Sequence, residues 1–227
     1  MSKPLSRRQF IGATTATLAA AQIPVHAEDT KPTEFQLACM TLPYSQFPLA
    51  RALKGIKAAG YRHVAWGTSH RETPGGKRIP VMATDAPTAK AKELGKQCRD
   101  LGLEPLMMFS TIYPEHKDGL KVLTHRLRQA AAAKIPQLLT FGHTKGGNRA
   151  VWIERFKKIG PIARDLGVLL VVKQHGGETG TGEACAKIVR EVNDAGIRVN
   201  YDAGNVMDYL NVNPIPDIRK YKRNQCI

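Results

Sequence analysis

Two predicted strands end in side chains that can transfer protons or stabilise charge. Lys173 and His175 follow Val168–Val172, five apolar residues in succession, and Asp202 follows the predicted strand 197–201. An amine, an imidazole and a carboxylate are groups that enzymes use as general acids, general bases and charge stabilisers. A lysine after such an apolar run is costly to bury without a partner. We therefore expect Lys173 to have one, with Asp202 as the candidate.

The elements that position these side chains alternate regularly from residue 35 onward. Apolar residues recur at three- and four-residue spacing in the predicted helices, and short apolar runs lie between them. We predict helices over residues 49–61, 86–102, 117–133, 150–167 and 182–196, and strands over 35–40, 63–66, 104–109, 137–141, 168–172 and 197–201. Residues 73–76, Thr-Pro-Gly-Gly, are predicted to lie in a loop.

Four predicted helices end in related phrases: Ala-Ala-Gly-Tyr, Asp-Leu-Gly-Leu, Asp-Leu-Gly-Val and Asp-Ala-Gly-Ile. Each glycine suits the left-handed position after a helix. The strands recur about every 30 residues, the length of one βα unit. Together these features predict a parallel sheet covered by helices, either a barrel or a doubly wound sheet. The first strand is not followed by G-x-G-x-x-G, which argues against a dinucleotide-binding doubly wound sheet.

The sequence resembles the xylose isomerase-like barrel family, which contains sugar phosphate isomerases and epimerases and the endonuclease IV group. The stretch 167–177, GVLLVVKQHGG, is similar to the fifth strand of the family, and 199–205, VNYDAGN, is similar to the sixth. The helix–glycine–strand rhythm extends the resemblance from residue 35 to about 215. It implies an α/β fold of the (β/α) TIM-barrel type, with the site at the carboxyl ends of the strands.

The resemblance also implies a divalent metal, Mn, Zn or Mg, held by carboxylates and histidine. Asp202 matches a metal ligand on the sixth strand, and His175 matches the second polar position of the fifth. Lys173 departs from the family, because many members have Glu or His there and a protonated amine is a poor metal ligand. Lys173 could act as a base or as an electrostatic stabiliser, or pair with Asp202. A metal site, a metal-free site and an inactive site all stay open.

Other residues are weaker candidates for substrate binding. His143 follows the predicted strand 137–141, Asn205 lies three positions after Asp202, and Trp66 ends the strand 63–66, where it could stack on a sugar. The structural alternatives are a solvated loop histidine, a turn-stabilising asparagine and a buried tryptophan. The Gly-rich loop 176–182 could hold a phosphate on its backbone amides, but it lacks the Lys-Ser/Thr signature of a P-loop.

The predicted function is an isomerase or epimerase, or a lyase, acting on a sugar or sugar derivative by proton transfer next to a carbonyl. Lys173 and His175 are the expected catalytic groups, with Asp202 and His175 as the expected metal ligands. One alternative is an inactive or sugar-binding barrel. Another is a DNA-repair nuclease of the endonuclease IV kind, which the positive charge allows but the expected export disfavours. The expected partner is therefore a small carbohydrate and not nucleic acid.

The N-terminus predicts export. Arg7 and Arg8 precede an apolar stretch rich in Ala and Thr, and the segment ends in Val25-His26-Ala27, with small residues at the two positions a signal peptidase reads. A charged start, an apolar middle and a small-residue end form a secretory signal, and paired arginines are typical of the twin-arginine (Tat) route. We expect a signal peptide over residues 1–27, passage through the Tat translocase and a periplasmic barrel domain over 28–227, without stable membrane insertion.

The net charge and the length of the chain limit the remaining interpretations. Without residues 1–27 the chain has 31 basic and 19 acidic residues, a net charge of +12, spread over the helices rather than gathered in one run. We expect a solvated basic surface. A (β/α)₈ barrel typically needs about 250 residues and eight strands, whereas we predict six strands in 200 residues. The polar, basic ending 219–227 resembles neither missing strand. We therefore expect a barrel incomplete at its C-terminus, or one closed by dimerisation.

Overall fold

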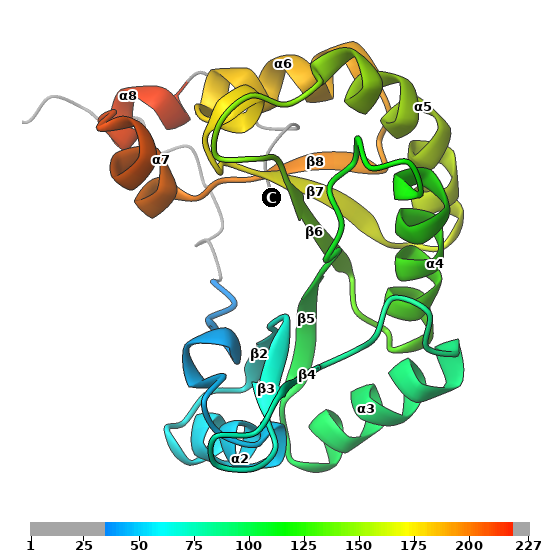
Figure 1. Cartoon of the computed structure of the whole chain (residues 1–227), viewed down its shortest axis with the longest axis vertical. Coiled ribbons are helices and arrows are strands. Elements are labelled where there is room, and N and C mark those ends of the chain that lie inside the picture. The colour runs from blue at the N-terminus through cyan, green and yellow to red at the C-terminus, as the bar shows by residue number, and fades with distance from the viewer. Residues whose placement is uncertain (1–34, 220–227) are drawn as a thin grey trace, which may run out of the picture. The chain divides into compact units, whose positions relative to one another are not determined.

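Six parallel strands joined in chain order form a curved sheet, which helices cover on its outer side (Figure 1). The computed structural model describes residues 35–219. The strands are β1 (Ala38–Met40), β2 (His63–Trp66), β5 (Glu104–Phe109), β6 (Gln137–Phe141), β7 (Leu169–Lys173) and β8 (Ile197–Asn200). The order β1-β2-β5-β6-β7-β8 never reverses, as it would in a doubly wound sheet, so the predicted barrel type is confirmed.

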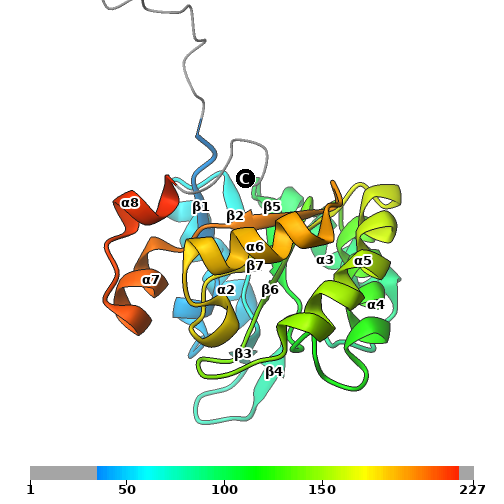
Figure 2. The same cartoon turned by 90° about the horizontal axis from the view of Figure 1, so that it is seen from above.

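Each helix of the outer layer follows its strand and returns the chain to the next one (Figure 2). These helices are α2 (Leu49–Ala58), α3 (Thr88–Asp100), α4 (Gly119–Ala132), α5 (Arg149–Asp165) and α6 (Gly182–Val192). All five lie within or close to their predicted ranges. Helix α5 continues through Pro161, which lacks an amide hydrogen, because Trp152, Phe156 and Ile159 are fully buried on one of its faces.

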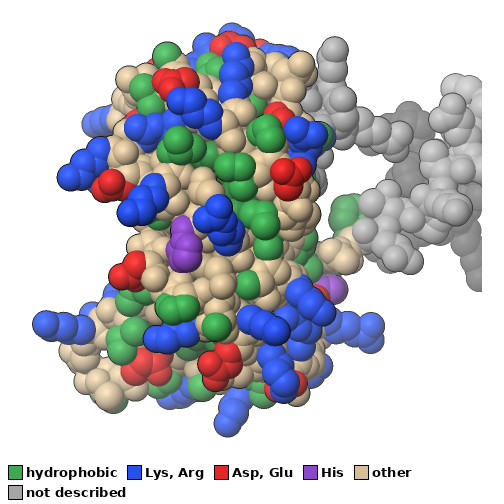
Figure 3. Space-filling view, turned by 90° about the vertical axis from the view of Figure 1, so that its right-hand side faces the viewer, with side chains coloured by type: hydrophobic (Ala, Val, Ile, Leu, Met, Phe, Trp, Pro, Cys, Tyr) green, Lys and Arg blue, Asp and Glu red, His purple; other side chains and the backbone are tan. Residues whose placement is uncertain are grey.

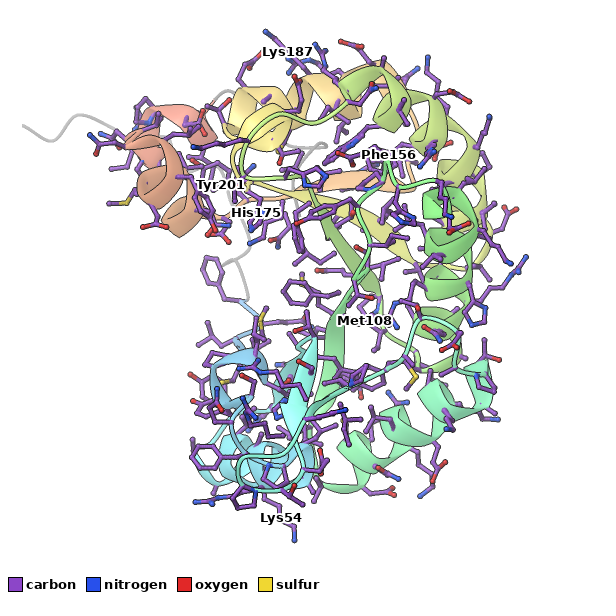
Figure 4. All side chains as sticks on the ribbon, viewed as in Figure 1. Lys54, Met108, Phe156, His175, Lys187 and Tyr201 are labelled. Carbon is purple, nitrogen blue, oxygen red and sulfur yellow. The ribbon has the colours of Figure 1, made fainter. Side chains whose placement is uncertain are left out.

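Strand alternation sorts side chains into two cores. Val64, Trp66 and Leu138 point outward and pack with the helices in the larger cluster. Residues of opposite parity point into the barrel interior, where Phe109, Leu139 and Val171 form a smaller cluster. In Figure 4, Phe156 lies between helix α5 and the sheet, whereas Lys54 and Lys187 extend from the outer surface. The central strands are therefore covered on both faces, as expected for a parallel sheet, whereas β1 is partly exposed.

Three parts of the fold were not predicted. Strands β3 (Ser69–Arg71) and β4 (Arg78–Pro80) form an antiparallel hairpin around the predicted loop at 73–76. After β8 come two short helices, α7 (Ala203–Leu210) and α8 (Pro214–Ile218). Both are too short to show a clear helical period in the sequence, and their boundaries are set by capping side chains, Asp202 and Asn213.

The two outer strands have one partner each in the described part of the chain. Strand β1 pairs with β2, and β8 pairs with β7. Residues 35–219 thus supply six of the eight strands typical of a closed barrel. The predicted signal peptide at 1–27 and the basic ending beyond residue 219 lie outside the described residues. Among the described helices, none has the length and apolar character needed to span a membrane.

A buried arginine connects the helix layer to the loop before α3. Arg126 of α4 is 2% exposed and donates to the carbonyl oxygens of Met82 and Phe109 and to Gln129 Oε1. Gln129 in turn donates to the carbonyl oxygens of Ala83 and Ala86. Burial lowers the pKa of Arg126 to about 10, since desolvation disfavours the charged form. The Arg126 guanidinium thus connects the carboxyl end of β5 to the loop that precedes α3.

We predict that Arg126→Leu lowers the free energy of unfolding by about 2 kcal/mol. The loss of donors to two buried carbonyls outweighs the relief of guanidinium desolvation. Urea titration followed by circular dichroism measures the change. Arg128→Leu, on an exposed position of the same helix, is the matched control and should change stability by less than ~0.5 kcal/mol. Equal effects of the two substitutions would contradict the role given to Arg126.

Candidate functional site

The barrel interior holds a cavity of about 610 Å³. Its wall is made of inward-facing side chains and of residues that follow the strands: Gln36, Ala38, Met40, Leu42, Ala65, Thr68, Leu106, Met107, Phe109, Gln137, Leu139, Phe141, Lys173, His175, Asn200 and Asp202. Most of these side chains are apolar, and the charged ones gather where β7 and β8 end. A mainly apolar cavity with a few convergent polar groups is the usual form of a small-molecule site.

Lys173 and Asp202 form an ion pair in the wall of this cavity. The Lys173 Nζ atom lies 3.1 Å from Asp202 Oδ2, and the two side chains are 15% and 29% exposed. The register places Lys173 beside Phe141 on one neighbouring strand and Asn200 on the other. The ammonium also lies 5.6 Å from the centre of the Phe141 ring. The expectation that Lys173 has a partner is therefore met by a carboxylate and an aromatic face.

The backbone and side chain of Gln174 fix Asp202 in place. The Asp202 amide donates to Gln174 Oε1 at 2.6 Å, and Asn205 Nδ2 donates to the Gln174 carbonyl at 2.7 Å. Asp202 also caps α7, because its Oδ1 accepts from the Asn205 amide at 2.9 Å. Gln174 is fully buried, so these bonds are shielded from water. Asn205, expected to touch substrate, instead supports Asp202 and does not line the cavity.

His175 lies at the same end of the cavity (Figure 4). Its Nδ1 is 2.8 Å from the Gly142 carbonyl, so we assign Nδ1 as the protonated nitrogen and Nε2 as the one that can accept a proton. The ring packs against Phe141 at 4.6 Å and against Tyr209 of α7 at 5.2 Å between centroids. The structure therefore brings together Lys173, His175 and Asp202, the three residues expected to do the chemistry.

Two expected substrate contacts lie elsewhere. Trp66 is 1% exposed and packs in the outer cluster between sheet and helices, because its strand turns it away from the interior. Trp66 therefore takes the buried position given above as its structural alternative, and it does not line the cavity. His143 also does not line the cavity. It stacks on Tyr113 at 3.7 Å between centroids, and its Nε2 is 3.3 Å from Glu115 Oε1.

Glu115 was missed by the sequence analysis, yet it connects two loops at this end of the barrel. Its Oε2 accepts from Trp152 Nε1 at 2.7 Å, while its Oε1 faces His143. Trp152 reaches it under Gly142, where an added Cβ would lie 2.8 Å from the indole ring. Glu115 follows no predicted strand directly, and nothing in its spacing distinguished it from other loop carboxylates.

Several amides of the Gly-rich loop after β7 already donate to backbone carbonyls, those of Glu178, Thr179 and Gly180. The Gly182 amide, at the start of α6, donates to Asp217 Oδ2 at 2.7 Å, and the Ala184 amide donates to Thr181 Oγ1 at 3.1 Å. Asp217 is 2% exposed and also accepts from the Tyr201 hydroxyl at 3.1 Å. A buried carboxylate already occupies the position that an anion would take at this helix N-terminus.

The donor set does not fit the divalent metal that the sequence implied. Asp202 Oδ2 faces the Lys173 ammonium, and Asp202 Oδ1 accepts from the Asn205 amide. Residues 35–219 contain no group of three or more His, Cys, Asp or Glu side chains placed to share an ion. Protein sites for Zn, Mg and Mn draw on several such ligands. The described residues alone would therefore hold a divalent ion poorly.

Comparisons with known proteins agree with this architecture. The family model described as xylose isomerase-like TIM barrel matches residues 53–224. A search of curated proteins found no match.

Solved structures resemble the chain in fold. A D-psicose 3-epimerase crystallised in the presence of D-fructose aligns with a TM-score of 0.64 at 13% identity, over 82% of this chain and 69% of that one. The IOLI protein with a bound zinc atom gives 0.64 at 12% identity, over 85% and 70%. A Mycobacterium smegmatis xylose isomerase-like barrel in complex with magnesium gives 0.61 at 16%, over 80% and 69%.

We predict that the Glu115–Trp152 contact is worth about 1–2 kcal/mol of stability beyond packing. Trp152→Phe keeps an aromatic ring but removes the N–H donor, and Glu115→Leu removes the oxygen that accepts the bond. In a double-mutant cycle by urea unfolding, the double variant should lose less than the sum of the two single losses. Strict additivity would show that the bond contributes nothing.

Proposed function

Because the chain belongs to the xylose isomerase-like TIM barrel family, we propose that it acts on a small neutral sugar or sugar derivative by moving a proton at the carbon next to a carbonyl. The observation that carries the proposal is the Lys173–Asp202 pair in the wall of the interior cavity, with His175 at the same end. The similarity in fold to D-psicose 3-epimerase supports a ketose as the first substrate to test.

The proposed reaction needs one base and one charge stabiliser. Removing the proton breaks a C–H bond, and the electron pair moves to the carbonyl oxygen to give an enediolate. Lys173 would stabilise that oxygen with its ammonium, as a preorganised cation in a largely apolar cavity. Nε2 of His175 or a carboxylate oxygen of Asp202 would take the proton and return it to the same or the neighbouring carbon. The product is then an epimer or an isomer.

The cavity wall favours an uncharged ligand. Its other polar side chains are mainly amides, those of Gln36, Gln137 and Asn200, which suit hydroxyl groups. The single cation among the lining residues, Lys173, already faces Asp202. A phosphorylated sugar would bring about two negative charges to a site with no surplus positive charge. Neutral sugars fit this balance better.

Two alternatives have less support. Sugar binding without turnover would use the same cavity and is separated from catalysis by the exchange experiment below. Nuclease activity would need a continuous basic surface along a phosphate backbone. On the face shown in Figure 3, acidic and uncharged side chains separate most of the Lys and Arg side chains, and one group of basic side chains lies together at the lower right.

We further propose that the protein is exported by the twin-arginine route and works in the periplasm. The support is in the sequence, where Arg7 and Arg8 precede the apolar stretch and Ala27 ends it. These residues lie outside the part of the chain that the structure describes. A periplasmic location agrees with a neutral substrate, because sugar phosphates are mainly cytoplasmic metabolites.

We predict that Lys173→Met reduces proton exchange at least about 100-fold, the usual effect of removing one oxyanion stabiliser. The measurement is deuterium incorporation from D₂O into D-fructose or D-psicose, followed by NMR with the full chain. Lys145→Met, at an exposed position of the loop after β6, is the control and should exchange at the wild-type rate. Unimpaired exchange in Lys173→Met would refute the role of the ammonium, and binding without any exchange would favour the sugar-binding alternative.

We predict that Arg7→Lys combined with Arg8→Lys retains the protein in the cytoplasm in a precursor form. The paired arginines are the feature that the Tat route reads. Fractionation of a bacterial host that expresses the full chain, followed by immunoblotting, measures the location. Lys3→Arg serves as the control and should be exported. Export of the double variant at the wild-type level would contradict the proposed route.

A further inference from the structure

We propose that the Lys173 ammonium takes the place of a divalent cation in this chain, so that the site works without a bound metal. The inference deepens the proposed function, on which it rests for the role of the cation toward substrate. It starts from a disagreement within the family. Two related structures are described with zinc or magnesium, whereas here a cation that belongs to the chain faces the expected metal ligand.

The ion pair blocks the carboxylate that a metal would need. Asp202 Oδ2 lies 3.1 Å from Lys173 Nζ, and Asp202 Oδ1 accepts from the Asn205 amide. The second bond also caps α7, so Asp202 cannot turn toward an ion without uncapping that helix. A divalent ion would therefore have to displace the ammonium from Oδ2 and would meet its positive charge at short range.

The other expected ligand, His175, has only Nε2 left for an ion. His175 Nδ1 is within hydrogen-bond distance of the Gly142 carbonyl, and its ring is packed between Phe141 and Tyr209. With His175 and Asp202 alone, the described residues supply two candidate ligands. A metal site in a protein usually needs three or more.

Neighbouring side chains hold the Lys173 ammonium in position beside the cavity. The lysine stem runs along the cavity wall between Phe141 and Asn200, and the charged end lies between the Asp202 carboxylate and the face of the Phe141 ring. The side chain is 15% exposed, so the ammonium is partly shielded from water and its charge is screened less than that of an exposed lysine. It can donate up to three hydrogen bonds, one of which goes to Asp202. The remaining donors can reach substrate oxygens.

The inference predicts a gain of function for a single substitution. Lys173→Glu replaces the cation with a carboxylate next to Asp202 and near His175, which gives the described residues three potential ligands in one place. The two carboxylates would repel each other unless a cation lies between them. The variant should therefore bind a divalent metal that the wild-type chain does not bind.

The experiment compares the full chain with its variants by thermal unfolding and by metal content after dialysis. The probes are Mn²⁺, Zn²⁺ and Mg²⁺ alone. Wild type should show no metal-dependent shift in Tm and no bound metal. Lys173→Glu should retain about one ion per chain, with a rise in Tm of roughly 5 °C or more at a metal concentration a hundred times its Kd. Adding Asp202→Asn to this variant should remove the shift.

Each result decides the inference. A wild-type chain that binds metal, and loses it in Asp202→Asn, would overturn it, because the ammonium would not exclude the ion. A folded Lys173→Glu that binds no metal would also overturn it, since Lys173 would then not be the obstacle. Lys173→His, which supplies a ligand without a second negative charge, is tested in the same way if Lys173→Glu does not fold.

The metal readout is independent of the reaction. If wild type exchanges ketose protons equally well in EDTA and in Mn²⁺, the proposed function and the inference both hold. If none of the tested sugars is turned over but the metal pattern is as expected, the exclusion of metal by Lys173 stands, and the role of the ammonium toward substrate fails with the proposed function. If turnover requires added metal, the proposed function stands and the inference fails.

Discussion

The hydrogen-bond register of the parallel sheet is the constraint on which the rest of the structure depends. It aligns Phe141, Lys173 and Asn200, which are about 30 residues apart in the chain, in one row across three strands. A shift of one residue in β7 would turn Lys173 toward the helices and Val172 into the cavity. The apolar outer faces prevent that shift, because it would bury a charge in the larger core. The same packing that stabilises the fold therefore decides which side chains face a ligand.

Buried polar side chains mainly form hydrogen bonds that connect one element to another. Arg126 and Gln129 hold the loop beneath α3, Gln174 connects the ends of β7 and β8, and Asp217 ties α8 to the start of α6. Each of these groups is almost fully buried. Buried polar groups of this kind cost little while they are satisfied and much when a partner is lost. They connect the elements of the described residues that surround the cavity.

Much of this could be predicted from the sequence, and the limits have physical causes. The strands and the five outer helices were predictable because periodicity and terminal glycines are local signals. The nearness of Lys173 and Asp202 followed from the parallel arrangement and needed no contact information. For Trp66 and Asn205 the sequence left a structural role open beside substrate binding. The direction in which a side chain points depends on register at single-residue precision, which periodicity does not give. Glu115 and Gln174 were missed because a residue that connects two elements is recognised only from its contacts in the folded structure.

Asp202 has two tasks that share one carboxylate group, the ion pair with Lys173 and the capping of a helix. One oxygen caps α7 and the other faces the ammonium, while α7 carries Tyr209 onto the ring of His175. Any change of charge at position 202 is therefore transmitted to the aromatic wall of the cavity through the helix that the residue caps. A substitution of Asp202 would disturb both the ion pair and the cap of α7, whereas a substitution of Lys173 would disturb only the ion pair. Of the two residues, Lys173 is therefore the one that can be replaced without changing the helix.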